Sequence, residues 1–595
     1  MTDRPAFLKL KIKNRSVLAS GILGVTISSL RKVHSRGAAI VTTKSIGPEK
    51  RKGHPAPVVY DWGGGIINAV GLSNPGIDGF VSRWKQALID FPVIVSIFGK
   101  TVKDFMIIAE KLEPLNYDFL ELNISCPNVS DEFGTPFSFS DKLTQDITRR
   151  AKTVTSRPVI VKLSPGIPDM VRIAVASQES GADAVCIANT AGPGMVIDTN
   201  TAVPVLANKT GGISGPAVLP LTVKNIFAAY KELSIPIIGT GGISGTNGAL
   251  QVLMAGASLY GIGSAVYSEG LGIFKEIGKG VLAFARENGF ESTQELIGLA
   301  HKTTKLRYYR IPGFVKSHAQ GTRYKKFQVV PVKEILDFDK GGIRTLFFES
   351  GGFSRPEPGQ FFMLWVPGSD QKPFSVSFFD EKEIGFSLMK RGKFSEAVFG
   401  LTEGEPVGLL GPLGNGFDLE RFNSYLLAGG GIGTAPLIYT AARLAKAGKK
   451  AHFIAGGKSR SSLEWIPPLV DKLKIGSDIE LLYCTEDGSF GEPGVVTEHF
   501  QKVIKKACPE YALVCGPEIF IKNSIAIFKK GRLQGQASIE RMMKCGIGIC
   551  GSCCVDGTGD RVCVEGPVFQ FDYIDRLTEF GNYKRDESGS VQRLD

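Results

Sequence analysis

The chain has 595 residues, of which 43% are hydrophobic and 22% charged, an ordinary composition for a folded protein of roughly four domains. Its formal net charge of +12 comes from scattered lysines and arginines, so we expect a solvated basic surface and no nucleic-acid partner, and its 10 cysteines follow no secretion signal, which argues against a disulfide framework. No apolar run approaches the ~20 residues needed to cross a bilayer, and residues 1–5 lack a signal-peptide core, so we expect a cytoplasmic protein without membrane association.

Short β-rich runs alternate with helical segments from residue 16 to about residue 285. Segments 102–112 and 221–230, for example, have apolar residues at helical spacing. Parallel strands need helical crossovers, so this α/β alternation predicts a (β/α)8 TIM barrel, with a doubly wound open sheet as the alternative. The eight expected strands are 17–20, 38–45, 92–99, 119–126, 158–164, 183–190, 236–243 and 258–266.

The pattern changes after a basic connector at 286–325. Strands without intervening helices then predict a small antiparallel β-barrel, and renewed alternation from residue 424 to about 530 predicts an α/β nucleotide-binding domain. The expected strands of the antiparallel barrel are 327–332, 343–349, 360–366, 374–379, 384–389 and 406–410. Those of the nucleotide-binding domain are 425–428, 451–455, 478–483 and 511–515.

One cysteine lies at the end of a predicted barrel strand, in Glu-Leu-Asn-Ile-Ser-Cys-Pro-Asn at 121–128. Catalytic side chains collect at the strand exits of such barrels, so Cys126 is the candidate nucleophile or base. The alternative is a small buried thiol, which is what we expect of Cys186 in its apolar strand.

Glycines follow the last two barrel strands, in Gly-Thr-Gly-Gly-Ile-Ser at 239–244 and Gly-Ile-Gly-Ser-Ala at 261–265. Glycines let backbone N–H groups approach a phosphate, and these two loops form the usual phosphate site of a TIM barrel. They therefore predict a phosphate-bearing cofactor such as FMN.

Two lysines and several asparagines also lie at strand ends. Lys44 and Lys162 need an anionic partner there, either a flavin or a substrate carboxylate, unless they only extend to the barrel rim. Amide side chains suit a flat heterocycle with C=O and N–H groups. These amides belong to Asn68, Asn123, Asn128 and Asn189.

Four motifs together resemble class 1 dihydroorotate dehydrogenase, in particular its NAD-linked type, over nearly all of residues 8–285. They are Asn-Ile-Ser-Cys-Pro-Asn (123–128), Asn-Ala-Val-Gly-Leu-Ser-Asn-Pro-Gly (68–76), Val-Lys-Leu-Ser-Pro (161–165) and Ala-Asn-Lys-Thr-Gly-Gly-Ile-Ser-Gly-Pro-Ala (207–217). The resemblance implies FMN contacts at Ser20, Lys44, Ser45, Ser96, Asn123, Lys162, Ala188, Gly215, Gly241, Gly242, Gly263 and Ser264. It implies substrate contacts at Lys44, Asn68, Ala69, Val70, Gly71, Leu72, Asn123, Asn128, Asn189 and Thr190.

The same resemblance makes Cys126 the base that removes the C5 proton of dihydroorotate, while FMN takes the hydride from C6. Two features depart from the family. Ser96 stands where an asparagine is usual, and the loop at 189–195 has an unusual sequence, Asn-Thr-Ala-Gly-Pro-Gly-Met.

In the second half, Lys-Pro-Phe-Ser-Val-Ser at 372–377 resembles the Arg-x-Tyr-Ser flavin motif of the ferredoxin reductase superfamily, with Lys and Phe for the usual Arg and Tyr. This implies FAD contacts at Lys372, Pro373, Phe374, Ser375, Leu388, Met389, Lys390 and Ser395. A glycine-rich turn at 427–436 follows a strand and opens a helix, which is typical of a pyrophosphate site and predicts NAD binding. Its glycines are Gly429, Gly430, Gly431 and Gly433.

Four cysteines near the C-terminus have the spacing of a metal cluster. Cys545, Cys550 and Cys553 have plant-type ferredoxin spacing, and Cys563 follows after nine intervening residues. Zinc usually takes two Cys-x2-Cys pairs and only one is present, so a 2Fe-2S cluster is expected, with Cys554 as a bystander.

Residues 325–570 resemble the electron-transfer subunit of the same dehydrogenase, normally a separate chain and here fused behind the catalytic one. We therefore predict oxidation of dihydroorotate to orotate in pyrimidine biosynthesis, with electrons passing from FMN through 2Fe-2S and FAD to NAD+, in a homodimer formed through the barrels. Alternatives are a dihydropyrimidine dehydrogenase and an NAD(P)H:ferredoxin-type module with a non-catalytic barrel. The expected parts are the FMN-binding barrel (1–300), a linker (301–325), the FAD domain (326–420), the NAD domain (421–535), the cluster segment (536–575) and a polar tail (576–595).

Overall fold

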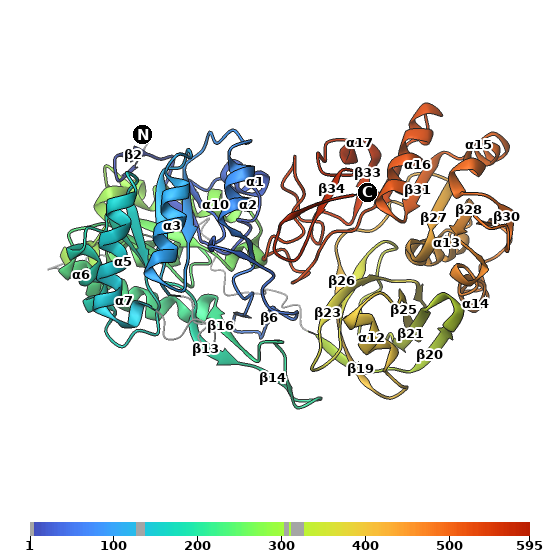
Figure 1. The fold of residues 1–595 in the computed structure, drawn as a ribbon, viewed down its shortest axis with the longest axis horizontal. Coiled ribbons are helices and arrows are strands. Elements are labelled where there is room, and N and C mark those ends of the chain that lie inside the picture. Colours follow the sequence, from blue (N-terminus) through green and yellow to red (C-terminus); the bar gives the residue numbers. More distant parts are fainter. Residues whose placement is uncertain (1–4, 126–136, 303–308, 311–326, 595) are drawn as a thin grey trace.

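The computed structural model describes residues 5–125, 137–302, 309–310 and 327–594. In Figure 1 the N-terminal half forms one body and the C-terminal half another, and the last segment of the chain lies between them. None of the described helices is long and apolar enough to cross a membrane.

The N-terminal half is a closed barrel of eight strands in the order β3-β4-β9-β10-β11-β12-β17-β18, and every neighbouring pair is parallel. Each of the eight predicted runs overlaps one of these strands, so the TIM barrel is confirmed and the open sheet is excluded. The strands are β3 Ser16–Leu18, β4 Ile40–Thr42, β9 Val93–Ile97, β10 Phe119–Asn123, β11 Val159–Lys162, β12 Ala184–Ile187, β17 Ile237–Thr240 and β18 Leu259–Ile262.

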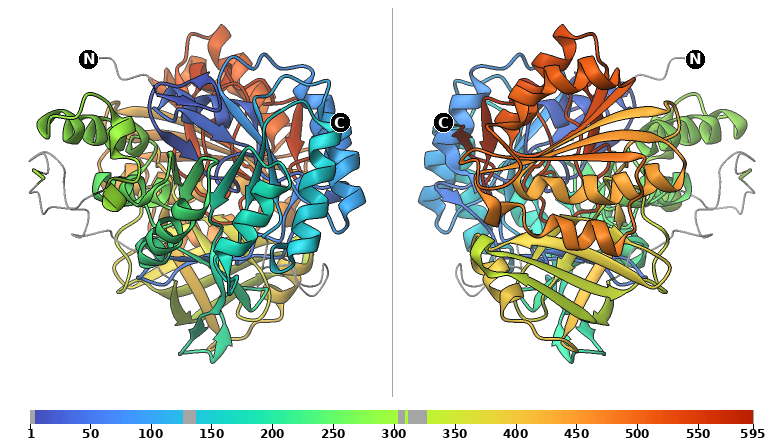
Figure 2. Two further views of the ribbon diagram at one scale, coloured as in Figure 1. Left: turned by 90° about the vertical axis from the view of Figure 1, so that its left-hand side faces the viewer. Right: turned by 90° about the vertical axis from the view of Figure 1, so that its right-hand side faces the viewer.

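Amphipathic helices cover the outside of the barrel (Figure 2). In α3 the buried residues Phe105, Ile108 and Leu112 share one face, and Thr101 caps the first turn by accepting the N–H of Asp104. The other helices around the barrel are α1 Ile27–Ser35, α2 Gly76–Trp84, α5 Asp141–Val154, α6 Met170–Glu179, α7 Leu219–Glu232, α8 Thr246–Ala255 and α10 Ile273–Glu287, and α3 itself is Val102–Leu112.

A second, antiparallel sheet is built from two loop insertions of the barrel. Its order is β13-β16-β7-β6, with strands β6 Val59–Asp61, β7 Ile66–Asn68, β13 Ala191–Met195 and β16 Thr210–Ser214. These strands have only three to five residues, and β13 and β16 contain two glycines each, so the sequence pattern did not predict them. The sheet carries Asn68, a predicted substrate contact, and most of the unusual loop at 189–195.

The region after residue 327 forms two four-stranded antiparallel sheets around one apolar core, as the strand-only pattern predicts. The expected strand at 374–379 is divided between the two sheets, and β20 and α12 were not predicted. The strands are β19 Gln328–Pro331, β20 Glu334–Phe338, β21 Ile343–Glu349, β22 Phe361–Trp365, β23 Gln371–Ser375, β24 Phe378–Phe379, β25 Glu383–Met389 and β26 Pro406–Leu413, and α12 is Lys393–Phe399.

The nucleotide-binding domain is a seven-stranded sheet in the order β30-β29-β28-β27-β31-β32-β33, in which the last pair alone is antiparallel. Strand β33 follows the four cysteines in sequence, so the cysteine segment is attached to the edge of this sheet. The elements are β27 Ser424–Gly430, α13 Ala435–Lys446, β28 Lys450–Gly457, α14 Ile466–Lys472, β29 Ile479–Thr485, β30 Glu492–Pro493, α15 Val496–Ala507, β31 Tyr511–Cys515, α16 Glu518–Lys530, β32 Gly535–Ser538 and β33 Val568–Gln570.

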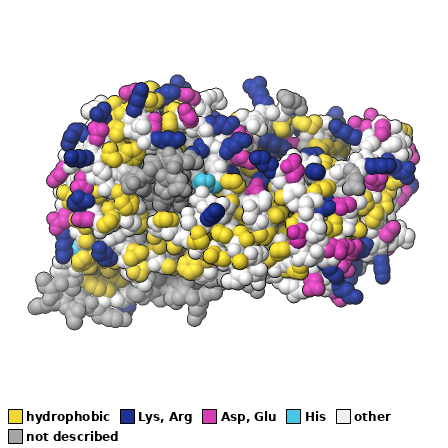
Figure 3. Space-filling model, turned by 60° about the horizontal axis from the view of Figure 1, so that its bottom comes forward, with side chains coloured by type: hydrophobic (Ala, Val, Ile, Leu, Met, Phe, Trp, Pro, Cys, Tyr) yellow, Lys and Arg dark blue, Asp and Glu magenta, His cyan; other side chains and the backbone are white. Residues whose placement is uncertain are grey.

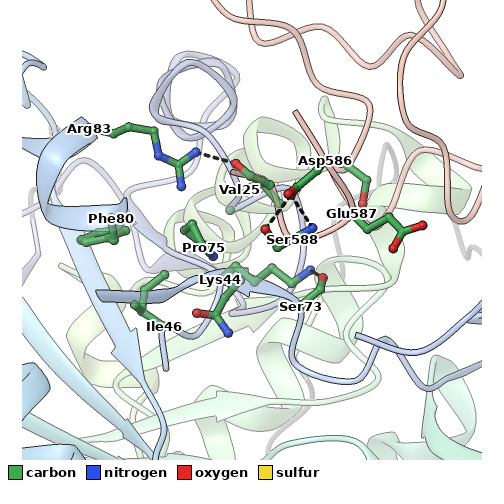
Figure 4. A pocket seen from close by; sticks show the side chains of 14 residues that line it. Val25, Lys44, Ile46, Ser73, Pro75, Phe80, Arg83, Asp586, Glu587 and Ser588 are labelled. Atoms are coloured by element: carbon green, nitrogen blue, oxygen red, sulfur yellow. Dashed lines mark hydrogen bonds between the residues drawn. The ribbon is translucent and has the colours of Figure 1, made fainter. Parts of the chain in front are cut away.

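The last residues, expected to be a polar tail, are folded in the structure as far as they are described. Leu577 and Phe580 are buried, and Tyr583–Arg585 (β34) pairs with Val591–Arg593 (β35). This hairpin contacts the barrel, since Lys50 Nζ lies 2.5 Å from Asp586 and Arg83 donates to the Gly589 carbonyl at 2.9 Å. Figure 4 shows Arg83 beside the hairpin residues Asp586, Glu587 and Ser588. The two halves of the molecule are therefore joined at the C-terminus.

A buried ion network holds the hairpin to the nucleotide-binding domain. The Arg541 guanidinium pairs with Glu518 at 2.9 Å and with Glu579, and Glu579 also pairs with Arg585 at 2.8 Å. The Arg541, Glu518 and Glu579 side chains are all at most 5% exposed. Removing one partner from such a network leaves uncompensated buried charge.

We therefore expect Arg541→Met to lower the free energy of the urea unfolding transition by about 3–5 kcal/mol. Lys506 pairs with Glu480 at 2.6 Å but is 67% exposed, so Lys506→Met is the matched control and should cost at most about 1 kcal/mol. Equal losses in the two variants would contradict the network's role.

Basic and acidic side chains are interspersed on the face shown in Figure 3. This distribution agrees with the expectation of a solvated basic surface.

Candidate functional site

A cavity that is partly open to solvent lies at the C-terminal ends of the barrel strands, and its space, including the open part, is about 1300 Å³. Most of the residues predicted for FMN and substrate line it, although they come from eight separate segments of the chain. They are Ser20, Lys44, Ser45, Asn68, Val70, Gly71, Leu72, Asn123, Lys162, Ala188, Asn189, Thr190, Gly241, Gly242, Gly263 and Ser264.

Three predicted residues do not line this cavity. Ala69 and Ser96 are fully buried behind it, and Gly215 adopts a φ of 110° next to Gly65. The predicted base Cys126 and the predicted substrate contact Asn128 lie outside the described residues.

The glycines of the cavity fit a phosphate group. Gly241 and Gly242 adopt φ values of 133° and 78°, and a Cβ on Gly242 would come within 2.4 Å of the Leu219 backbone nitrogen. Gly263 is different, because the nearest atoms to its Cβ would be 3.7 Å away and its φ is ordinary. Protein packing therefore does not require glycine at 263, whereas close approach of a ligand to the backbone would.

Lys44 is a buried cation in the wall of the cavity. Its Nζ donates to the Ser73 hydroxyl at 2.8 Å, as Figure 4 shows. Burial, together with repulsion from Lys544, lowers the pKa of Lys44 to about 8. On its other side Lys44 borders a smaller pocket, which is also lined by residues 586–589 of the C-terminal hairpin. An anionic ligand in the larger cavity would compensate this charge.

Amide and hydroxyl groups in the cavity hold one another in place. Asn123 donates to Ser45 at 3.0 Å and accepts from Ser125 at 3.0 Å. Asn189 donates to Ser125 at 2.9 Å. Asn68 donates to the Gly212 carbonyl at 3.2 Å. The amides are thus oriented before any ligand binds, which favours specific recognition of a polar ring.

Several lining residues were not predicted. Val59, Ile66 and Ile213 come from the inserted sheet and supply an apolar side to the cavity. Ile549 and Cys550 come from the cysteine segment, more than 500 residues after Ser20. Their only sequence signal was the cysteine spacing itself, which says nothing about the barrel.

The four spaced cysteines are buried together. Cys553 Sγ lies 3.4 Å from Cys563 Sγ, and Cys545 accepts hydrogen bonds from the thiols of Cys550 and Cys563. These hydrogen bonds, with others from the backbone N–H groups of Cys550 and Ile547, hold the pKa of Cys545 well below its usual range. Paired sulfurs with N–H donors directed at them are what an iron–sulfur cluster requires.

No three His, Cys, Asp or Glu side chains in the described parts of the chain are arranged to hold a single metal ion. The Cys545 sulfur is hydrogen-bonded to both Cys550 and Cys563, and Cys563 also contacts Cys553, so the four sulfurs form one connected group. The adjacent Cys554 packs into the barrel core, as expected of a residue that is not a ligand. The Leu23 N–H donates to the Ile549 carbonyl at 3.2 Å, which fixes the cysteine segment to the barrel.

The predicted FAD residues lie on β23 of one sheet, at the end of β25 of the other sheet, and near the start of α12. Lys372 pairs with Asp370 at 3.0 Å, and the Phe374 ring stacks on Phe394 with centroids 5.8 Å apart. The Leu388 side chain is buried in the apolar core, so a flavin could contact this residue only through its backbone. Ser395 accepts the backbone N–H groups of Arg391 and Gly392 at the start of α12.

Pro373 and Ser375 lie on β23 with Lys372, Met389 ends β25, and Lys390 donates its backbone N–H to the Gly342 carbonyl. In the nucleotide-binding domain, Gly429 and Gly430 end β27, and Gly431 and Gly433 lie in the short 3-10 helix that leads into α13. A Cβ on Gly433 would come within 2.5 Å of Gly516 Cα. Two glycine loops therefore meet at the C-terminal edge of this sheet, where pyrophosphate groups bind in open α/β sheets.

Known proteins resemble both ends of this chain. Residues 4–284 match the family "Dihydroorotate dehydrogenase", and residues 540–575 match "Iron-sulfur cluster binding domain of dihydroorotate dehydrogenase B". The second match contains all four spaced cysteines.

Curated relatives match the N-terminal half almost over their whole length. The catalytic subunit of dihydroorotate dehydrogenase B (NAD(+)) from Pyrococcus horikoshii is 42% identical over 293 residues, covering 49% of this chain and 96% of the relative. The same subunit from Methanosarcina mazei is 43% identical over 296 residues, covering 49% of this chain and 93% of the relative.

A solved NADH-dependent reduced ferredoxin-NADP oxidoreductase superposes on 41% of this chain and 89% of its own, with 24% identity and a TM-score of 0.37, which is too low to support a structural argument. The family match and the near-complete coverage of the curated relatives are decisive by themselves. The chain belongs to the dihydroorotate dehydrogenase family.

Proposed function

We propose that this chain oxidises dihydroorotate to orotate and reduces NAD+, as an enzyme of pyrimidine biosynthesis in which the catalytic and electron-transfer parts are fused. The observation that carries the proposal is the composition of one cavity. Most of the residues expected to bind flavin and substrate line it together with Cys550 of the cysteine segment. The proposed substrate and FMN cavity is therefore lined in part by a proposed ligand of the iron–sulfur cluster, within a single chain.

The barrel residues would bind and orient the substrate. The buried Lys44 ammonium supplies the charge that an orotate carboxylate needs, and the amides of Asn68, Asn123 and Asn189 offer donors and acceptors to the ring. Cys126 is proposed as the base that takes the C5 proton, with Asn128 as a further substrate contact. Ala69 would act through the backbone of its loop, since its side chain is buried behind the cavity.

Four groups would supply the redox chemistry when bound: FMN in the barrel cavity, a 2Fe-2S cluster, FAD and NAD+. Together they would accept the two electrons that leave C6 of the substrate. Gly241, Gly242, Gly263 and Ser264 would hold the FMN phosphate. Cys545, Cys550, Cys553 and Cys563 would hold the cluster. The segments at 372–375, 388–395 and 429–433 would bind FAD and NAD.

We also propose the part boundaries given above, a homodimer formed through the barrels, and a cytoplasmic location without membrane or nucleic-acid partners. The resemblance to class 1 enzymes supports the dimer. Sedimentation of the purified chain at twice its 64.0 kDa mass is the expected result.

The decisive experiment is an anaerobic titration of the purified chain with dihydroorotate. Both flavins should bleach, and added NAD+ should restore their absorbance while NADH forms. Dihydrouracil lacks the carboxylate that Lys44 would bind and should do neither at the same concentration. Equal turnover of dihydrouracil would indicate a dihydropyrimidine dehydrogenase. NADH oxidation with dyes but never with orotate would indicate an electron-transfer module with a non-catalytic barrel.

A further inference from the structure

A carboxylate lies inside the barrel directly beneath the cavity. Glu121 is in the middle of β10, where side chains alternate between the barrel interior and the surrounding helices. Phe119, two residues earlier, packs in the interior core, whereas Leu120 and Leu122 pack outward against the helices. Glu121 therefore points into the interior, one layer below Asn123, and it does not line the cavity.

Two polar groups from the neighbouring strands contact this carboxylate. Ser96 on β9 donates to Glu121 Oε1 at 2.8 Å, and Lys162 Nζ on β11 lies 3.8 Å from the same oxygen. The side chains of Lys162 and Glu121 are only 4% and 3% exposed. A buried charge is costly unless it is paired, so each of these two groups stabilises the charged form of the other.

Lys162 reaches the cavity and Glu121 does not. We propose that Glu121 is a positioning residue: it partly neutralises Lys162 and thereby sets how strongly the barrel prefers reduced over oxidised FMN. This inference rests on the proposed function only in taking FMN as the occupant of the cavity.

The same geometry gives Ser96 a role. Ser20, Ser45 and Ser96 form a chain of hydroxyl contacts of 3.1 Å and 2.9 Å that continues to Glu121. Ser20 and Ser45 line the cavity, whereas Ser96 is buried behind them. Ser96 thus orients the carboxylate and the cavity hydroxyls instead of contacting the flavin.

The charges of Lys162 and Glu121 determine the direction in which the FMN potential should shift. Reduced FMN carries more negative charge at its ring than oxidised FMN, so a cation beside the ring favours the reduced form. A carboxylate that offsets the cation weakens this preference. In Glu121→Gln the amide retains the shape and can still accept from Ser96, but Lys162 loses its anionic partner and interacts more strongly with the reduced ring.

The experiment is a reductive titration of the full holoenzyme with a chemical reductant and reference dyes, without dihydroorotate. Glu121→Gln should raise the preference for reduced over oxidised FMN about tenfold, equivalent to about 30 mV in the two-electron potential. The FAD transition should not move and serves as an internal reference. Asp183→Asn is the matched control, because Asp183 pairs with Lys152 at 2.7 Å just before β12, at the opposite end of the barrel.

The Lys162→Met background tests whether Glu121 acts through Lys162. Without the cation there is no Lys162 charge for Glu121 to offset, so adding Glu121→Gln should shift the FMN potential much less than it does when Lys162 is present. An equal shift in both backgrounds would overturn the proposal, because Glu121 would then act on the flavin directly. An unchanged potential in folded, FMN-loaded Glu121→Gln would overturn it as well.

Ser96→Ala keeps the inference testable if Glu121→Gln does not fold. Ser96→Ala removes one hydrogen bond to the Glu121 carboxylate, so it should shift the FMN potential by less than Glu121→Gln does. This shift should also become smaller in the Lys162→Met background. An unmoved potential in this variant would contradict the inference. These titrations contain no substrate, so their results do not depend on whether dihydroorotate is the substrate. If the protein did not oxidise dihydroorotate, the shifts in the FMN potential would still be expected.

Discussion

Replacing Cys550 with alanine should abolish NAD+ reduction by dihydroorotate while the barrel flavin is still reduced by the substrate. Cys550 is one of four buried cysteines with paired sulfurs, and it also lines the barrel cavity. Loss of one of four thiolate ligands removes the cluster. The barrel site keeps its lysines, amides and glycine loops, so a dye that accepts electrons at this flavin should still be reduced.

The neighbouring Cys554 provides a matched control for this variant. It is as buried as Cys550 but packs into the barrel core. Cys554→Ala should therefore retain iron, the cluster absorbance and NAD+ reduction, with only a loss of stability. Retention of full NAD+ reduction in an iron-free Cys550→Ala protein would contradict an electron path through the cysteine segment.

Replacing Cys126 with alanine should slow the bleaching of the barrel flavin by dihydroorotate about 10²–10⁴-fold, measured anaerobically by stopped flow. General bases contribute rate factors of this size. FMN content should be unchanged, since the glycine loops at 241–242 and 263–264 that would hold the phosphate lie on other strands. Cys126→Ser should also be slow at neutral pH, because a hydroxyl ionises far less readily than a thiol.

Cys508→Ala is the control, since Cys508 is exposed at the end of α15 in the nucleotide-binding domain. It should leave the bleaching rate unchanged. If Cys126→Ala bleached at the rate of the unchanged protein, another group would have to take the C5 proton.

The sequence by itself determined the architecture of the barrel and the chemical type of each site. Alternation of β-rich and helical runs predicted all eight barrel strands, because parallel strands require helical crossovers. Motifs at strand ends, such as the glycines after β17 and β18, predicted the cavity lining because strand exits in a barrel converge on one face. Cysteine spacing predicted the ligand set of the cluster, since ligands in one loop are a local property of the chain.

Only the tertiary structure decided which distant segments meet. It placed Ile549 and Cys550 against the barrel cavity, folded the last residues onto Lys50 and Arg83, and built a sheet over the strand ends from two loop insertions. It also showed that Ser96, predicted from the family pattern as a flavin contact, is buried behind the cavity on Glu121. Periodicity and spacing report on residues close in sequence, whereas these contacts depend on how completed elements pack against one another.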